Sequence, residues 1–152
     1  MSIEAKLAEL GITLPQAAAP VASYQAVVVT GNMAFLSGQL PFVDGQLVTG
    51  KLGADVSLET GQQAARACGL MILAQLKSAG LLERVEQVVK LGGFVASTPD
   101  FTDQPKVVNG CSDLMAEVFG DAGKHARSAV GVPVLPLDAA VEGDAIVALR
   151  PH

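Results

Sequence analysis

Residues 126–132, with the sequence ARSAVGV, and residues 140–149, with the sequence AVEGDAIVAL, contain the pattern that decides the fold. Both runs are rich in small and β-branched apolar residues, which is typical of strands, and a turn-like segment, LPLD at 135–138, lies between them. Arg127 and Glu142 are embedded in this strand-like sequence. Rigid elements position side chains better than loops do, so the pair suggests a site for a small carboxylated molecule and a reactive water.

Hydrophobic spacing predicts the other elements. Apolar residues recur every three to four positions and stop at a glycine in three stretches, which predicts helices over 2–10, 58–79 and 107–118. Strands are expected over 26–29, 33–37, 85–95, 128–134 and 140–149, the first two forming a hairpin around Thr30-Gly31-Asn32. Gly38 is expected to break the second strand, Asp44-Gly45 to form a turn between 42–43 and 46–48 that implies a third strand or small flap, and 14–20 to form an extended connector.

This order, β-β-(β)-α-β-α-β-β, predicts an α/β (α+β) fold with a mixed sheet and two helices packed on one face. We expect a single domain over residues 1–152, with the N-terminal helix and connector of residues 1–20 appended to it. Half of the residues are hydrophobic, 16% are charged and the mean hydropathy is +0.42. Because large apolar surfaces are rarely left exposed, we expect the uncovered face of the sheet to meet another subunit in a homo-oligomer.

Charge and motif content exclude several classes of function. A net charge of −5 provides no basic surface for nucleic acid. No run approaches the ~20 apolar residues of a membrane span, and no signal peptide is evident, so we expect a cytoplasmic protein without a membrane partner. Cys68, Cys111, His125 and His152 lack metal-ligand spacing, and no glycine-rich phosphate loop is present. We therefore expect no metal and no cofactor, with buried thiols at both cysteines and loop or tail positions for both histidines.

The sequence from about 20 to 150 resembles the reactive intermediate deaminases, the RidA or YjgF group, at motifs in matching order: Tyr24, Gly31-Asn32, Ser37-Gly38-Gln39-Leu40-Pro41, Asn109, Arg127-Ser128, Leu135-Pro136, and Val141-Glu142 before Ala145-Ile146. The resemblance implies a chorismate-mutase-like fold and a homotrimer whose inter-subunit clefts bind small carboxylated metabolites. It also implies an imine/enamine deaminase, a hydrolase acting on C–N bonds. The expected reaction is cofactor-independent hydrolytic deamination of small 2-imino or 2-enamino acids to 2-oxo acids and ammonia.

By this resemblance Arg127 anchors the substrate carboxylate and Glu142 orients or activates water, while Tyr24, Ser37, Asn109 and Ala129 are substrate-binding positions. The chain departs from the deaminase branch at Ala129, where that branch usually has cysteine, and at Gly131, where it usually has an acid. These departures support an alternative, a non-catalytic trimeric module that binds or senses a small carboxylate. An endoribonuclease, the third activity attached to relatives, is disfavoured by the acidic charge.

Each candidate also has a structural interpretation. Arg127 could form an ion pair within the fold, with Glu142 as one possible partner, and Glu142 could be an exposed strand residue. Tyr24 could pack against its neighbours, and Ser37 could hydrogen-bond to the local backbone at the end of its strand. Asn109 could make a hydrogen bond between subunits as well as a contact to substrate.

Overall fold

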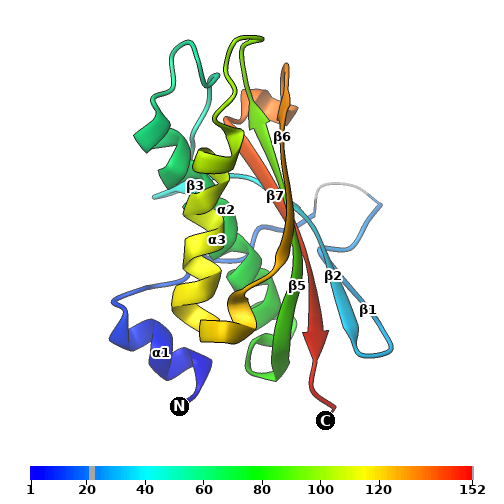
Figure 1. The fold of residues 1–152 in the computed structure, drawn as a ribbon. Coiled ribbons are helices and arrows are strands. Elements are labelled where there is room, and N and C mark those ends of the chain that lie inside the picture. Colours follow the sequence, from blue (N-terminus) through cyan, green and yellow to red (C-terminus); the bar gives the residue numbers. More distant parts are fainter. Residues whose placement is uncertain (21–22, 152) are drawn as a thin grey trace.

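A mixed sheet of five strands forms the centre of the structure, a computed structural model that describes residues 1–20 and 23–151 (Figure 1). Within this sheet β5 and β6 run parallel, and the other neighbouring strands are antiparallel. Across the sheet the strands lie in the order β1 (Val27–Thr30), β2 (Met33–Gln39), β7 (Val141–Leu149), β5 (Val85–Ala96) and β6 (Ala126–Val132). Strand β6, which begins at Ala126, therefore lies at one edge of the sheet, and strand β7, which begins at Val141, lies at its centre.

Two helices cover one face of this sheet, as the sequence predicts (Figure 1). Helix α2 (Leu58–Ser78) begins at Ser57, whose hydroxyl accepts a hydrogen bond from the backbone N–H of Thr60. Helix α3 (Gln104–Phe119) packs against it so closely that a Cβ at Gly110 would collide with a backbone carbonyl of α2. Together α2 and α3 bury the apolar side of the sheet, and this layer is the core.

Strict alternation along β7 separates the two faces of the sheet. Val141, Ala145 and Leu149 are buried beneath the helices, whereas Glu142 and Asp144 are half-buried and point to the opposite face. Helices α1, α2 and α3 all lie on one side in Figure 1, and the other face carries apolar side chains that stay exposed, including Phe35 at 43% and Val130 at 45%.

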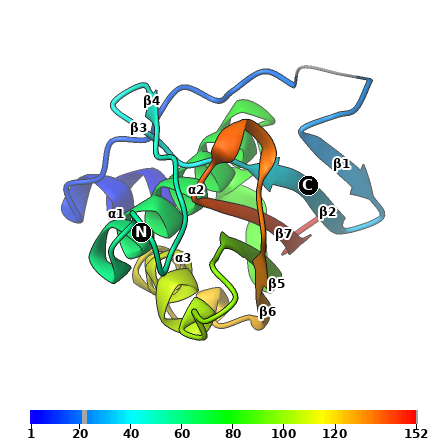
Figure 2. The same ribbon diagram turned by 90° about the horizontal axis from the view of Figure 1, so that it is seen from above.

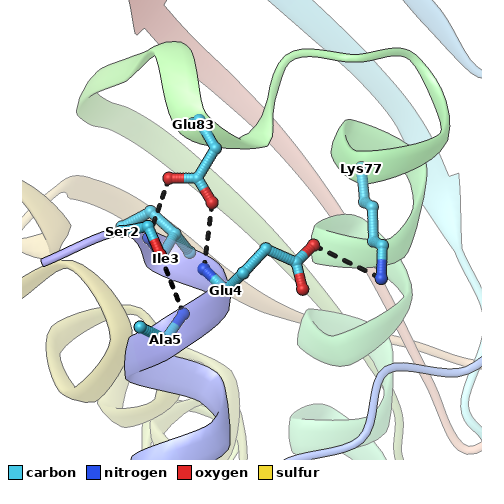
Figure 3. Close-up of polar contacts among 6 residues, drawn as sticks. All are labelled: Ser2, Ile3, Glu4, Ala5, Lys77 and Glu83. Atoms are coloured by element: carbon cyan, nitrogen blue, oxygen red, sulfur yellow. Dashed lines mark hydrogen bonds and ion pairs between the residues drawn. The ribbon is translucent and has the colours of Figure 1, made fainter.

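The N-terminal segment docks against the end of this layer. Helix α1 (Ile3–Glu9) buries Leu7, and the carboxylate of Glu83 accepts hydrogen bonds from the backbone N–H groups of Ile3 (2.8 Å) and Glu4 (2.9 Å) (Figure 3). A carboxylate at this end is favourable because the first N–H groups of a helix lack intrahelical partners. Figure 2 shows the connector leaving α1 and crossing past α2 toward the side of β1.

The short elements complete the chain. Strands β3 (Phe42–Val43) and β4 (Gln46–Leu47) form a small hairpin at Asp44-Gly45, which is the flap predicted from the sequence. The described residues also include the 3-10 turns η1 (Leu82–Arg84), η2 (Gly120–Gly123) and η3 (Pro136–Asp138). Within the described part of the chain, no helix has both the length and the apolar character needed to cross a membrane.

Two strand expectations need correction. Strand β2 does not end before Gly38 but continues to Gln39 through an irregularity in its pairing with β7. The C-terminal strands flank the expected turn, but β6 covers Ala126–Val132 rather than 128–134 and does not pair with β7, because β5 lies between them. The arginine and the glutamate are consequently separated by a strand.

Candidate functional site

Arg127 lies on edge strand β6 with its side chain on the helix-covered face, against α3. Its Nη1 donates hydrogen bonds to Asn109 Oδ1 (2.7 Å) and to Ser112 Oγ (3.1 Å), which sit one helical turn apart on α3. In the described residues the other guanidinium nitrogens have no hydrogen-bond partner and no carboxylate lies within ion-pair distance of Arg127. The interpretation of Arg127 as an ion-pair partner of Glu142 is therefore wrong. One edge of the fixed, half-buried guanidinium of Arg127 is available to a ligand.

His125 extends this network. Its Nε2 lies 2.9 Å from Ser112 Oγ, and its Nδ1 lies 2.6 Å from the carbonyl oxygen of Gly123. Because the carbonyl can only accept, Nδ1 carries the proton in the neutral ring and Nε2 accepts from the hydroxyl of Ser112. That hydroxyl oxygen in turn accepts from Arg127. The histidine does lie in a loop, as expected, yet it orients the hydroxyl that holds the arginine.

The two departures from the deaminase pattern lie on the same face as Arg127. Ala129 is half-buried and packs against the core beside Gly93, its partner on β5. A Cβ at Gly131 would lie 2.6 Å from Nε2 of Gln104, so the side chain of Gln104 fills the space that a side chain at 131 would need. Gln104 is held there by a 2.8 Å hydrogen bond to the carbonyl oxygen of Phe101.

Glu142 lies on central strand β7 and points to the opposite face. Burial raises its pKa, and the negative charge of Asp144, two residues along the same face, raises it further. Gly38 lies directly against it, because a Cβ at that position would come within 2.5 Å of Glu142 Oε2. A carboxyl with a raised pKa is suited to accept and return a proton during a reaction near neutral pH.

A cavity of about 420 Å³ opens in front of Glu142. It lies within the range of roughly 300–1,000 Å³ that is usual for small-molecule sites. The rim includes Tyr24, which is 48% exposed. The wall is mainly apolar and is formed by Ala18, Ala19, Pro20, Ala26, Gly38, Gln39, Leu40, Phe42, Met71, Gln75, Pro136 and Leu137.

Ser37 does not line this cavity. Its hydroxyl donates to the carbonyl oxygen of Gln25 (2.6 Å), and its backbone N–H donates to Ala26 (2.9 Å). These bonds fix the chain just before β1, where Tyr24 is placed. The interpretation of Ser37 as a group that hydrogen-bonds to the backbone thus describes the contacts that the structure shows.

The candidate residues therefore form two half-sites within one chain. Arg127 pairs with Leu91 and Glu142 with Phe94 on the shared neighbour β5. Two strand spacings and three positions along β5 place their Cα atoms roughly 14 Å apart. An odd offset along a strand also puts the two side chains on opposite faces. We call the group around Arg127, with Asn109, Ser112, His125 and Ala129, the anchor half-site, and the cavity at Glu142 the carboxyl half-site.

The sulfur and histidine groups give no sign of a metal centre in residues 1–20 and 23–151, where no three His, Cys, Asp or Glu side chains cluster as metal ligands would. Cys68 and Cys111 are buried unpaired thiols, as the sequence indicates. Burial raises the pKa of Cys111 to about 12 and also raises the pKa of Cys68. Both thiols are therefore protonated and poorly reactive at neutral pH.

Residues 4–144 match the family model described as "YjgF/chorismate mutase-like, putative endoribonuclease". The chain belongs to the YjgF/RidA family. Its mixed sheet with helices on one face is the YjgF/chorismate-mutase-like fold of that family, so the resemblance drawn from the motifs is confirmed.

Several relatives place the chain within the YjgF/RidA family. It is 52% identical over 151 residues to TCP17 of Trypanosoma cruzi, covering 97% of this chain and 94% of that protein. It is 30% identical over 141 residues to a 2-iminobutanoate/2-iminopropanoate deaminase of Dermatophagoides farinae, covering 91% and 95%. The family thus includes deaminases of 2-imino acids.

Solved structures show the same relationship. Atu1372, a protein of unknown function from Agrobacterium tumefaciens, is 46% identical with a TM-score of 0.89, covering 99% of this chain and 93% of its own. E. coli TdcF, solved with bound serine, is 25% identical with a TM-score of 0.64, covering 90% and 94%. A member of the YjgF/RidA family has therefore been observed with a small metabolite.

Proposed function

We propose that this YjgF/RidA protein hydrolyses small 2-imino or 2-enamino acids to 2-oxo acids and ammonia, without a cofactor, in clefts shared between subunits of a homotrimer. The observation that supports the proposal is the presence of two chemically complementary half-sites on the same chain. One presents a guanidinium edge that fits a carboxylate, and the other presents a carboxyl with a raised pKa in an apolar cavity.

Arg127 supplies the anchor. Its planar fork can donate two parallel hydrogen bonds to the substrate carboxylate, while Asn109 and Ser112 occupy its Nη1 and prevent the group from rotating. Holding the carboxylate fixes the adjacent C=N carbon in space. Positioning of this kind lowers a barrier because the reacting groups no longer need to find their geometry.

Glu142 supplies the proton transfers. Glu142 takes a proton from water as the water oxygen bonds to the imine carbon, and it returns this proton to the nitrogen, which receives the electron pair of the C=N bond. In the resulting carbinolamine, Glu142 takes the hydroxyl proton as the C=O bond forms and delivers it to the nitrogen, which leaves with the electron pair of the C–N bond as ammonia. The balance is imino acid plus water giving 2-oxo acid plus ammonia, with Glu142 returned to its starting state.

Assembly of several copies of the chain would bring the two half-sites together. Arg127 and Glu142 lie on opposite faces of one sheet, so a single chain cannot bring both to one ligand. The helix-free face exposes Phe35 and Val130 in an isolated chain, and apolar surface of this kind is suited to contact with another copy. A ring of three copies would pair the anchor half-site of one protomer with the carboxyl half-site of its neighbour.

The test is ammonia release from 2-iminobutanoate generated enzymatically in the assay. Arg127→Ala should reduce the rate to that of the uncatalysed reaction. The matched control is Lys106→Ala, which removes an exposed ion pair with Asp103 (3.9 Å) outside both half-sites and should leave the rate unchanged. Equal activity of Arg127→Ala and the parent would refute the proposal.

One observation favours a second candidate, the binding or sensing module. Ala129 and Gly131 replace residues usual in the deaminase branch, and Gln104 fills the space at Gly131. Such a module would bind 2-oxo acids through Arg127 without accelerating imine hydrolysis. Calorimetry with 2-oxo acids beside the ammonia assay separates the two, since only the deaminase shows both binding and turnover.

A further inference from the structure

The N-terminal connector forms one wall of the carboxyl half-site. Ala18, Ala19 and Pro20 line the cavity in front of Glu142, together with Leu40 from the end of β2 and Met71 from α2. The connector reaches this position after crossing past α2 from the end of α1 (Figure 2). An element that looks appended in the sequence therefore contributes directly to the shape of the proposed site.

Buried amides hold the connector at the cavity. Nε2 of Gln75 donates to the carbonyl oxygen of Ala18 (2.7 Å) and to Oε1 of Gln39 (3.2 Å). Gln39 in turn donates to the carbonyl oxygen of Ser37 (3.0 Å). Gln75 and Gln39 are only 5% and 6% exposed. Because a buried polar group without a partner is costly, these bonds fix the connector to α2 and β2.

The other end of the connector is held by α1. Both oxygens of Glu83 bind the first N–H groups of the helix, and Glu4 forms an ion pair with Lys77 on α2 (3.3 Å) (Figure 3). With α1 docked at one end and Ala18 tied at the other, the segment between them is confined to the surface of α2. The cavity wall is therefore a fixed part of the fold.

The cavity is suited to an apolar substituent. Apart from Glu142 its charged or amide groups are few, and most of its lining is aliphatic or aromatic. On the far side of Ala18 lies a second cavity of about 760 Å³, which shares Ala18, Phe42 and Met71 with the first. The two spaces adjoin at these shared residues, and the second is also lined by Gln63, Arg66 and Asp44. Room for an apolar substituent thus extends away from Glu142 as far as the shared residues Ala18, Phe42 and Met71.

We infer that the connector makes the carboxyl half-site selective for 2-imino acids with long apolar side chains, such as the imine derived from leucine, over the imine derived from alanine. This inference rests on the proposed function and names its substrate class. The side chain of the substrate lies against Ala18, Ala19 and Met71, while its reacting carbon faces Glu142. Removing apolar groups from water supplies the preference.

The test narrows the cavity without changing Arg127 or Glu142. Ala19→Phe places a ring in the wall, and Ala5→Phe makes the same change at an exposed position of α1 that lines none of the described cavities. The imines of leucine and alanine are generated by an amino acid oxidase, and kcat/KM is measured for each. We expect Ala19→Phe to lower the leucine-to-alanine ratio at least about tenfold, the scale of hydrophobic-pocket discrimination. For Ala5→Phe we expect the same leucine-to-alanine ratio of kcat/KM as for the parent. An unchanged ratio for Ala19→Phe would overturn the inference.

Gln75→Leu provides a second variant, which keeps the bulk of the side chain but cannot donate to Ala18. Release of the wall should raise KM for the leucine imine more than it lowers kcat. Equal effects on both substrates would indicate a merely structural role and would count against the inference.

If the parent protein accelerates hydrolysis of no imine, the proposed function is refuted but the inference about the cavity is not. The inference is then tested by measuring the dissociation constants of 4-methyl-2-oxopentanoate and pyruvate. Tighter binding of the longer acid that is lost in Ala19→Phe would support the selective wall, and equal or absent binding would overturn it.

Discussion

The anchor half-site and the carboxyl half-site are built in opposite ways. Around Arg127 the structure places hydrogen-bond partners, Asn109, Ser112 and behind it His125, so a charge is fixed in direction. Around Glu142 it places apolar surface and a second acid, so a charge is disfavoured and the pKa is raised. The contrast suggests a division of work, in which one group holds the ligand and the other exchanges protons with it.

Glu142→Gln should separate the two roles most strongly. The amide keeps the shape of the side chain but cannot accept and return a proton, so kcat should fall by about 10²- to 10⁴-fold, the usual range for loss of general acid–base catalysis. Binding of a 2-oxo acid, measured by calorimetry, should change little, because the anchor is untouched. A loss of binding as large as the loss of turnover would show that the two half-sites do not divide the work.

Gly38→Ala should displace the same carboxyl without removing it. A Cβ here meets Oε2 of Glu142 at 2.5 Å, so the flexible acid must move while the backbone, which has no positive φ at Gly38, stays unstrained. We expect kcat to fall at least about tenfold while Tm shifts by only a few degrees.

Gly131→Ala is the matched control for this change, since its Cβ would meet the end of the Gln104 side chain at 2.6 Å and not a proposed catalytic group. Activity close to the parent is expected. An active Gly38→Ala variant would contradict the placement of Glu142.

Ser112→Ala should weaken the anchor by less. It removes one of the two acceptors that hold Arg127 Nη1 and leaves the bond to Asn109 in place. Loss of one such hydrogen bond, about 1 kcal/mol, corresponds to roughly fivefold weaker binding of a 2-oxo acid. Ser128→Ala, one residue from Arg127 but on the other face, should bind as the parent does. Identical affinities for the two variants would remove Ser112 from the anchor.

The pH dependence of stability should show a smaller effect, which is specific to the carboxyl half-site. Because burial and Asp144 raise the pKa of Glu142, its ionised form costs stability at neutral pH, and that cost disappears as pH falls through the raised pKa. Glu142→Gln should therefore be more stable than the parent at pH 7, with the difference shrinking toward pH 4. Thermal melts across this range provide the measurement, and a difference that grows on acidification would contradict the assignment.

Asp144→Asn should move the acid limb of kcat/KM to lower pH, because it removes the negative charge that disfavours ionisation of Glu142. A limb that stays in place would show that Asp144 does not act on this group.

The local structure was largely predictable from the sequence. Helical spacing in 58–79 and 107–118 corresponds to α2 and α3, and the valine-rich run at 85–95 corresponds to β5. These patterns reflect burial on one face of each element, so they are visible without tertiary information. The motifs around Arg127 and Glu142 likewise identified the family.

Long-range pairing could not be predicted in the same way. The placement of β5 between β6 and β7 depends on contacts between distant segments, and the register of both pairings along β5 puts the two candidates on opposite faces. Gly38 resembled a strand breaker, although the structure shows it as the space that Glu142 requires. Ser112 and His125 carried only a weak signal, the i, i+2 spacing of His125 and Arg127.

The central claim is that Arg127 of one protomer and Glu142 of its neighbour serve the same ligand. The most direct measurement mixes two inactive variants, Arg127→Ala and Glu142→Gln, by co-expression or joint refolding, and follows imine hydrolysis by the mixed oligomers. In a random equal mixture about one quarter of the shared clefts combine an intact arginine with an intact glutamate, so about a quarter of the parental activity should return. Activity no higher than that of the separate variants would contradict the claim, because sites formed within one chain would always lack one of the two groups.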